Sequence, residues 1–256
     1  MEIKLLEKSE DNAKFLVQGI DFSFANLIRR SIMDEVPVMA IDEVTFHKNS
    51  SALYDEIIAH RLGLLPLSTD SKSYEVKEKC KCQGKGCARC QLNLVLQAKG
   101  PCTVYAENIK SKDPKVKPVQ PNMPIIKLLK GQQLQFEATA SLGYGREHVK
   151  YSPGLVFYRQ VADVKLKGDA DRDKLNKICP QNILVLAGSK LKVSDNLKCD
   201  MCLACADISK EIEITPKEDE FIFEVESWGQ LDPKAMVLAG LESFKDKLKE
   251  MDKQLK

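Results

Sequence analysis

The sequence predicts an α+β fold, in which helices near the two ends flank a middle region built mostly of strands. Apolar residues recur every three to four positions in 24–32 and in 237–255, as on one face of a helix. In 134–142 they recur at every second position, as in a strand with one buried face. The 256 residues are enough for one large domain or for two to three small ones.

The first helix has an expected beginning and end. Ser23 is its expected N-cap, because a serine hydroxyl can accept a hydrogen bond from the first free backbone amides. The helix should end near Val36, since Pro37 disfavours the helical conformation in the residue before it. A second helix is expected over 53–62, with Gly63 ending it.

Strands are expected wherever apolar and polar residues alternate. These segments are 3–5, 15–17, 38–47, 92–96, 134–142 and 221–225. Polar, charged or proline-rich segments are expected to be loops or domain boundaries, namely 110–124, 167–178 and 209–220.

The last helix is expected to begin at Asp232 and Pro233, an N-cap followed by proline at the first helical position. Its apolar residues alternate in spacing between four and three, which is a heptad seam. They are Val237, Leu241, Phe244, Leu248, Met251 and Leu255.

The first helix carries a second apolar face, made by Phe24, Leu27, Ile28 and Ile32. We expect both faces to meet a second subunit, and the alternative is that the seam packs on the chain's own core.

Charge and hydropathy argue against a nucleic-acid-binding, membrane-spanning or secreted protein. The net charge of +2 provides no overall electrostatic footprint for nucleic acid. No apolar run reaches the roughly 20 residues that span a bilayer, and the charged N-terminus lacks a signal core. We therefore expect a cytoplasmic protein with reduced thiols, in which clustered cysteines bind metal and do not form disulfides.

The first cysteine group places four thiols within eleven residues, at Cys80, Cys82, Cys87 and Cys90. A tetrahedral ion needs four sulfurs that converge from a tight turn, and Gly84 and Gly86 allow the backbone to fold back. Zn²⁺ is the expected ion. A closed shell of four sulfurs leaves no open position, so the expected role is structural.

The second group comprises Cys199, Cys202 and Cys205, with Cys179 and Pro180 twenty residues upstream. A cysteine triplet with a remote Cys-Pro is typical of bacterial-type ferredoxins, although there the Cys-Pro follows the triplet. We expect an iron–sulfur cluster of the [4Fe–4S] or [3Fe–4S] type, with zinc as the alternative.

Other reactive residues do not form a catalytic set. The histidines His47, His60 and His148 are scattered, and Cys102 is expected to be a small buried apolar residue. The sequence contains no dinucleotide-binding fingerprint, P-loop or zinc-protease motif. We expect no catalytic residue in this chain.

Several segments resemble one known family. The segment 24–37 (FANLIRRSIMDEVP) resembles the first helix of the alpha-like subunits of cellular RNA polymerases. Further matches in the same order are 40–42, 55–66, 131–132, 142–153, 223–229 and the last helix. With the second cysteine group included, the resemblance is to the alpha-like subunits of archaeal RNA polymerases. Those subunits are similar to the third-largest subunit of RNA polymerase II and to the N-terminal domain of bacterial alpha.

The resemblance implies a specific organisation. Residues 1–38 and 213–256 would form a dimerisation domain, 39–166 an inserted mostly-β domain, and 167–212 a ferredoxin-like insertion. Subunit L would be the dimer partner, the small subunits N and P would lie nearby, and the large catalytic subunits would assemble on the pair. Arg29, Arg30 and 55–66 are similar to elements that face the large subunits. DNA would be contacted only indirectly, through the complex.

The metal content rests on this chain's own cysteines, because many members of the family lack one or both groups. Two other functional classes are compatible with clustered cysteines. One is an iron–sulfur protein for electron transfer or redox sensing, against which the lack of a flavin or nicotinamide motif argues. The other is a zinc-ribbon nucleic-acid binder, against which the near-neutral charge and the 6% aromatic content argue.

Overall fold

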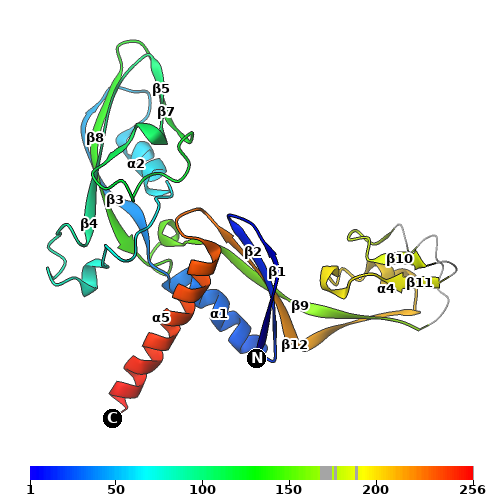
Figure 1. Cartoon of the computed structure of the whole chain (residues 1–256). Coiled ribbons are helices and arrows are strands. Elements are labelled where there is room, and N and C mark those ends of the chain that lie inside the picture. Colours follow the sequence, from blue (N-terminus) through cyan, green and yellow to red (C-terminus); the bar gives the residue numbers. More distant parts are fainter. Residues whose placement is uncertain (168–174, 176–177, 188–189, 256) are drawn as a thin grey trace. The chain divides into compact units, whose positions relative to one another are not determined.

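The computed structural model of the chain describes residues 1–167, 175, 178–187 and 190–255 (Figure 1). Separate helices and largely antiparallel sheets confirm the predicted α+β class. The chain groups into two compact units. The first comprises Met1–Lys8, Lys14–Leu27 and Phe157–Glu224, and the second Ser9–Ala13, Ile28–Val156 and Val225–Lys256. Among the described helices, none combines the length and the apolar character that a membrane crossing requires.

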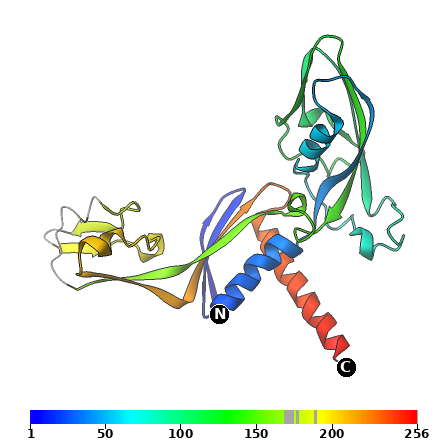
Figure 2. The ribbon, with the colours of Figure 1, turned by 180° about the vertical axis from the view of Figure 1, so that it is seen from behind.

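A four-stranded sheet in the order β1-β2-β12-β9 joins strands from distant parts of the sequence (Figure 2). The strands are β1 (Glu2–Lys8), β2 (Asn12–Gln18), β12 (Ile212–Ser227) and β9 (Gly154–Leu166). One face is aromatic, with the rings of Phe15 and Phe223 stacked 5.3 Å apart. The other face buries Leu16, Val161 and Ile222. The sheet therefore has apolar contacts on both sides.

β12 corrects one expectation. The acidic segment 209–220 was expected to be a boundary, but the strand already begins at Ile212. None of its charged residues is buried while the backbone pairs with its neighbours, so polarity alone did not exclude a strand.

The segment between β9 and β12 carries the second cysteine group. It contains the antiparallel pair β10 (Leu184–Ala187) and β11 (Lys190–Val193), and the short helix α4 (Ala204–Ile208). A small core includes Val164, Leu184 and Ile212 together with two of the cysteines. The expected boundary 167–178 lies largely outside the described residues. The limits of the three expected domains remain a prediction.

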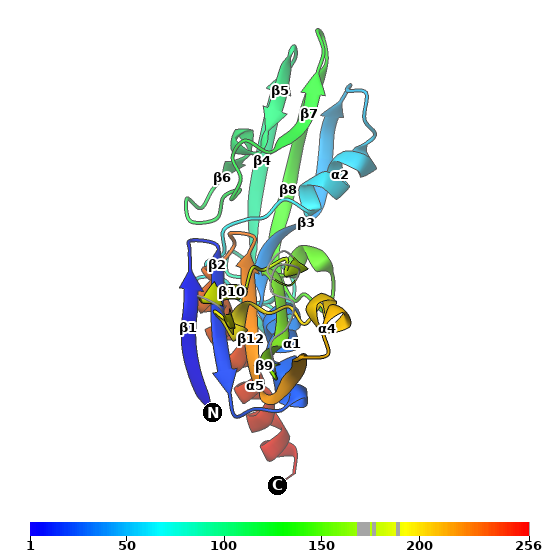
Figure 3. The ribbon, with the colours of Figure 1, turned by 90° about the vertical axis from the view of Figure 1, so that its right-hand side faces the viewer.

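The second unit contains a sheet in the order β3-β8-β4-β6 (Figure 3). Its strands are β3 (Val38–Asn49), β8 (Gln133–Gly143), β4 (Gln91–Lys99) and β6 (Lys110–Ser111). The period-2 prediction for 134–142 is confirmed, since Leu134, Phe136 and Ala138 are buried. A second pair is formed by β5 (Cys102–Tyr105) and β7 (Pro124–Leu128). Helix α2 (Asp55–Gly63) packs on β3 through a side that buries Ile58 and Leu62.

Helix α1 (Phe22–Glu35) ends where Pro37 predicts, but its N-cap differs from the prediction. The Asp21 carboxylate accepts a hydrogen bond from the amide of Phe24 at 2.8 Å, so Asp21 and not Ser23 caps the helix. Both residues can cap, and the chain entering from β2 decides between them. Helix α5 (Pro233–Gln254) begins as expected, with the Asp232 side chain accepting from the amides of Lys234 and Ala235.

The C-terminal half of α1 and the N-terminal half of α5 meet without space for a side chain at Gly240. A Cβ on Gly240 would lie 2.8 Å from Cγ1 of Ile32 and 3.0 Å from its Cα and N. Ile32 and Met236 are fully buried beside this contact. The glycine thus lets the two helix backbones approach closely.

Gly240→Ala is predicted to destabilise the protein. In an ordinary helix interior this change stabilises by about 0.5–1 kcal/mol, but here the added methyl pushes α5 away from α1. We expect a loss of about 1 kcal/mol or more, measured by thermal unfolding, where 1 kcal/mol shifts the midpoint by about 2–4 °C. Gly63→Ala is the matched control, since its Cβ would meet only the Ile41 carbonyl at 3.8 Å. A raised midpoint for Gly240→Ala would contradict the prediction.

Candidate functional site

The four cysteines of the first group converge in the loop between the 3-10 turn Lys77–Lys79 and β4. Sγ–Sγ distances are 3.6 Å for Cys80–Cys87, 3.6 Å for Cys82–Cys90 and 3.8 Å for Cys87–Cys90. All four sulfurs lie within 4.8 Å of one another. A tetrahedron of sulfurs about 2.3 Å from a central Zn²⁺ has an edge of about 3.8 Å, so the sulfurs fit a single ion.

The backbone of this loop turns as the glycine spacing predicts. Gly84 and Gly86 have φ of 77° and 84°, a region that favours glycine. The amide of Cys87 donates to Sγ of Cys90 at 3.2 Å. Such an amide stabilises a thiolate, which is the form of cysteine that binds metal.

The thiols of this group also shift one another's pKa values. Hydrogen bonds from neighbouring thiols, that of Cys80 first, lower the pKa of Cys82 to about 7. Burial is the main cause that raises the pKa of Cys90. The group therefore combines a thiol of lowered pKa, Cys82, with one of raised pKa, Cys90. A bound cation would replace the thiol protons, because metal binding to cysteine releases them.

Asp42 of β3 anchors the start of the cysteine loop. Its carboxylate pairs with Lys77 at 2.9 Å and with Lys150 at 2.9 Å. Burial works to raise the pKa of Asp42, but the hydrogen bonds from Lys150 and Lys77 outweigh it and lower the pKa to about 2. Since Lys77 lies three residues before Cys80, this ion pair ties the loop to the sheet. No sequence motif indicated it.

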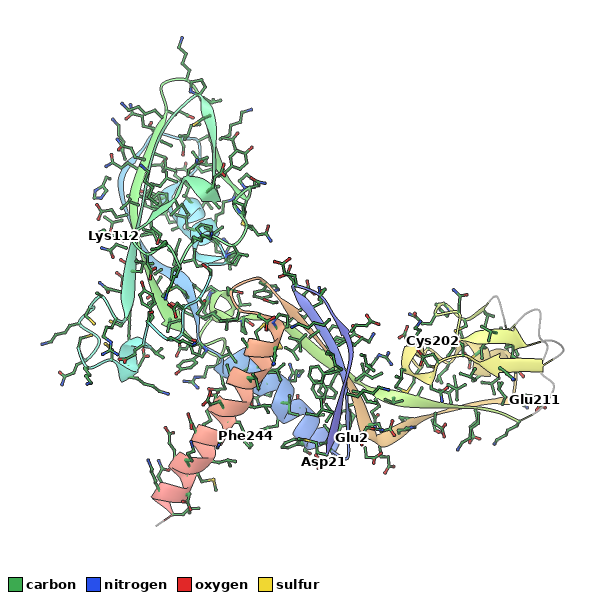
Figure 4. All side chains as sticks on the ribbon, viewed as in Figure 1. Glu2, Asp21, Lys112, Cys202, Glu211 and Phe244 are labelled. Atoms are coloured by element: carbon green, nitrogen blue, oxygen red, sulfur yellow. The ribbon has the colours of Figure 1, made fainter. Side chains whose placement is uncertain are left out.

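The second cysteine group lies in the small core between β9 and β12. Cys199 and Cys205 are buried, Cys179 is half-buried against the same apolar residues, and Cys202 is exposed (Figure 4). Burial raises the pKa of Cys199 and of Cys205. Cys179 and Cys202 also act to raise the pKa of Cys199, after burial. Among the described residues, only the first group brings its ligand atoms within 4.8 Å of one another.

The loop that carries the triplet is held in an unusual conformation. Met201 and Leu203, which lie on either side of Cys202, have positive φ of 52° and 62°. A residue other than glycine in this region costs about 1–2 kcal/mol, and such strain persists where the surroundings impose it. The side-chain amide of Gln181 donates to the Asp200 carboxylate and so joins the Cys179 turn to the triplet.

The remaining residues that the sequence singled out have structural roles or face solvent. His47 pairs with Glu137 at 3.4 Å, and Nδ1 of His148 accepts from the amide of Lys150. His60 lies in the last turn of α2. The expectation for Cys102 was wrong, because this residue is exposed at the beginning of β5.

The two apolar helix faces differ in exposure. Ile28 and Ile32 of α1 are buried within the chain, whereas Phe24 and Leu27 are half-buried. On α5, Val237 and Phe244 are half-buried, and exposure of the seam rises toward the C-terminus. The exposed fractions are 36% for Leu241, 49% for Leu248, 58% for Met251 and 76% for Leu255.

The comparisons with known proteins identify the family. Residues 40–155 match the family model of the RNA polymerase Rpb3/RpoA insert domain. The chain is 38% identical to the DNA-directed RNA polymerase subunit Rpo3 of Methanosarcina acetivorans over 257 residues, covering 98% of this chain and 97% of that protein. The subunit Rpo3 of Archaeoglobus fulgidus is 35% identical over 255 residues, with the same coverage of 98% and 97%. That of Pyrococcus furiosus is 48% identical over 159 residues, covering 62% and 59%. The chain therefore belongs to the Rpo3 family of alpha-like RNA polymerase subunits, which partner with other subunits of that enzyme.

Proposed function

We propose that this chain is a non-catalytic assembly subunit of archaeal DNA-directed RNA polymerase. It heterodimerises with subunit L, and the pair nucleates assembly of the large catalytic subunits, with subunits N and P nearby. The complex works in the cytoplasm, and DNA is bound by the assembled enzyme. The observation that carries the proposal is the exposed apolar seam on the C-terminal half of α5.

The C-terminal half of α5 makes mainly ionic and polar contacts within its own unit, and Leu248, Met251 and Leu255 stay exposed. Glu35 of α1 pairs with Lys247, and this pairing lowers the pKa of Glu35 although burial opposes it. Ser243, Asp246 and Glu250 line a charged groove together with Lys79, at the start of the cysteine loop. By helical periodicity, these three residues of α5 lie roughly opposite the seam.

Three leucines and a methionine repeating at heptad spacing on an exposed side match what a partner helix buries. Figure 4 labels Phe244, which lies midway along this seam. Full burial of a leucine or methionine contributes about 1.5–3 kcal/mol. Ile28 and Ile32, buried within the chain, hold α1 in place, and Phe24 and Leu27 extend the apolar surface on α1.

The double variant Leu241→Asp plus Leu248→Asp is predicted to abolish heterodimerisation. Each aspartate would have to be desolvated against the partner without a counter-charge, at a cost of several kcal/mol. Copurification with tagged subunit L and gel filtration measure the effect. Lys253→Asp, on the side of α5 away from the seam, is the control and should still dimerise. A double variant that copurifies like the wild type would contradict the assignment of the interface.

We propose that Cys80, Cys82, Cys87 and Cys90 hold one Zn²⁺. The fit of their sulfur spacing to a tetrahedral ion supports this. The ion would crosslink a loop that has few apolar residues of its own, in the way structural zinc contributes to folding. The ion pair of Asp42 with Lys77 fixes one end of this loop on the sheet.

Cys87→Ser is predicted to remove about one equivalent of zinc per chain, because three sulfurs no longer close the tetrahedral shell. The loosened loop should then be cleaved by trypsin at Lys81, Lys85 and Arg89. Elemental analysis and limited proteolysis check this. Cys102→Ser, a change at an exposed residue outside the loop, should keep both the zinc and the resistance. Full zinc content in Cys87→Ser would refute the proposed ligand set.

We propose that Cys179, Cys199, Cys202 and Cys205 hold an iron–sulfur cluster. A cluster binds its cysteines through different irons, so the ligand sulfurs stand farther apart than around a single ion. The wider arrangement of this group and the strained backbone at Met201 and Leu203 support the proposal. When bound, the cluster would crosslink the insertion between β9 and β12 and thereby tune assembly.

Cys202→Ser is predicted to lower recruitment of the large subunits while the heterodimer with subunit L still forms. The cluster lies in the insertion, whereas the seam lies on α5, so the two functions separate. Reconstitution with purified large subunits and an anaerobic iron and sulfide count measure both effects. Unchanged recruitment in a variant shown to lack the cluster would rule out a role in assembly.

A further inference from the structure

Arg159 of β9 holds the main chain next to one cysteine of the second group. Its Nη1 donates to the carbonyl oxygen of Cys199 at 2.8 Å, and its Nη2 donates to that of Leu197 at 2.5 Å. The guanidinium group thus spans two carbonyls that lie 38 and 40 residues away in the sequence. Such a double contact uses the planar fork of arginine, which a lysine cannot reproduce.

The two carbonyls belong to one short turn. Asn196–Lys198 form a 3-10 turn whose C-cap is Cys199, and the Asp195 side chain caps its beginning by accepting from the amide of Leu197. The turn is therefore ordered by its own hydrogen bonds. Arg159 attaches the end of this turn to a strand of the sheet.

An apolar contact accompanies the polar one. The side chain of Leu197 packs against Leu16, Val161 and Ile222, which form a buried face of the sheet β1-β2-β12-β9. Arg159 and Val161 are two residues apart on β9 and so project from the same face. The turn is consequently attached to the sheet at two points, one charged and one apolar.

This attachment decides where the thiol of Cys199 lies. Cys199 is buried, and its carbonyl cannot move without breaking the bond to Arg159. Cys202, three residues further on, is exposed, and its neighbours Met201 and Leu203 carry the loop away at positive φ. One cysteine of the set is therefore fixed to the sheet before any ligand binds.

We propose that Arg159 is a positioning residue for the iron–sulfur ligand Cys199, which it holds against the sheet so that the cluster site is pre-organised. This inference rests on the proposed cluster. Groups that orient metal ligands without touching the metal typically contribute 10–100-fold to metal affinity. A role that is only structural would alter stability and leave the cluster's spectrum and lability unchanged.

The test uses the full chain coexpressed with subunit L and purified without oxygen. Arg159→Met removes both hydrogen bonds and keeps an apolar stem, and Arg159→Lys keeps the charge but not the fork. Lys165→Met is the matched control, because Lys165 lies on the same strand, is 62% exposed and pairs with nearby Asp163 at 3.0 Å. The measurements are iron and sulfide content, the rate of iron release to a ferrous chelator, and the EPR spectrum of the reduced cluster.

Arg159→Met is expected to release iron about tenfold or more faster than the wild type, with an altered EPR spectrum. The iron-release rate of Arg159→Lys should lie between those of the wild type and Arg159→Met, and that of Lys165→Met should match the wild type. All variants should still copurify with subunit L. Wild-type release rates and spectra in both Arg159 variants would overturn the role of Arg159 alone. Wild-type protein without iron and sulfide would overturn the proposed cluster and this inference with it. If Arg159→Met does not fold, Arg159→Lys decides the question.

Discussion

The pairing of β12 with β2 on one side and with β9 on the other is the constraint on which the rest of the structure depends. These strands come from the beginning, middle and end of the chain, so their pairing closes the intervening segments into insertions. The amide of Gly19 donates to the carbonyl of Asp219 at 2.8 Å, and that of Lys167 donates to Glu211 at 2.8 Å. The second of these bonds closes the segment that carries Cys199, Cys202 and Cys205.

The two cysteine groups use the same ligand type but are held in place by different parts of the structure. In the first, four sulfurs converge in one loop to the spacing of a single ion, and glycines make the turn. In the second, the thiols are spread over a small core and depend on contacts with the sheet, through Leu197 and Arg159. The first site is thus local to its loop. The second requires the sheet to be formed.

Burial on the terminal helices separates internal contacts from the proposed partner surface. Gly240 lets α1 and α5 approach so closely that Ile32 becomes fully buried. Further along α5, ionic contacts replace apolar ones within the unit, as between Lys247 and Glu35. The C-terminal part of the apolar seam stays exposed to solvent. One helix therefore both completes the chain's own core and presents a surface for another subunit.

The sequence by itself determined the features that depend on neighbours along the chain. These are the amphipathic helices, the alternating strand 134–142, the stop at Pro37 and the tight cysteine loop 80–90. Local rules could not decide which of Ser23 and Asp21 caps α1, because both residues can do so. They also could not predict that Cys102 is exposed, because the register of its strand sets which side chains face solvent. They could not show that the acidic segment 209–220 pairs as a strand, because pairing depends on distant partners.

Only the tertiary structure decided the contacts that hold the cysteine groups in place. Asp42 meets Lys77 and Lys150 across 35 and 108 positions, and Arg159 meets Cys199 across 40. No spacing rule connects residues so far apart. The physical reason is that hydrogen bonds and ion pairs act over a few ångströms in space, whatever the separation along the chain.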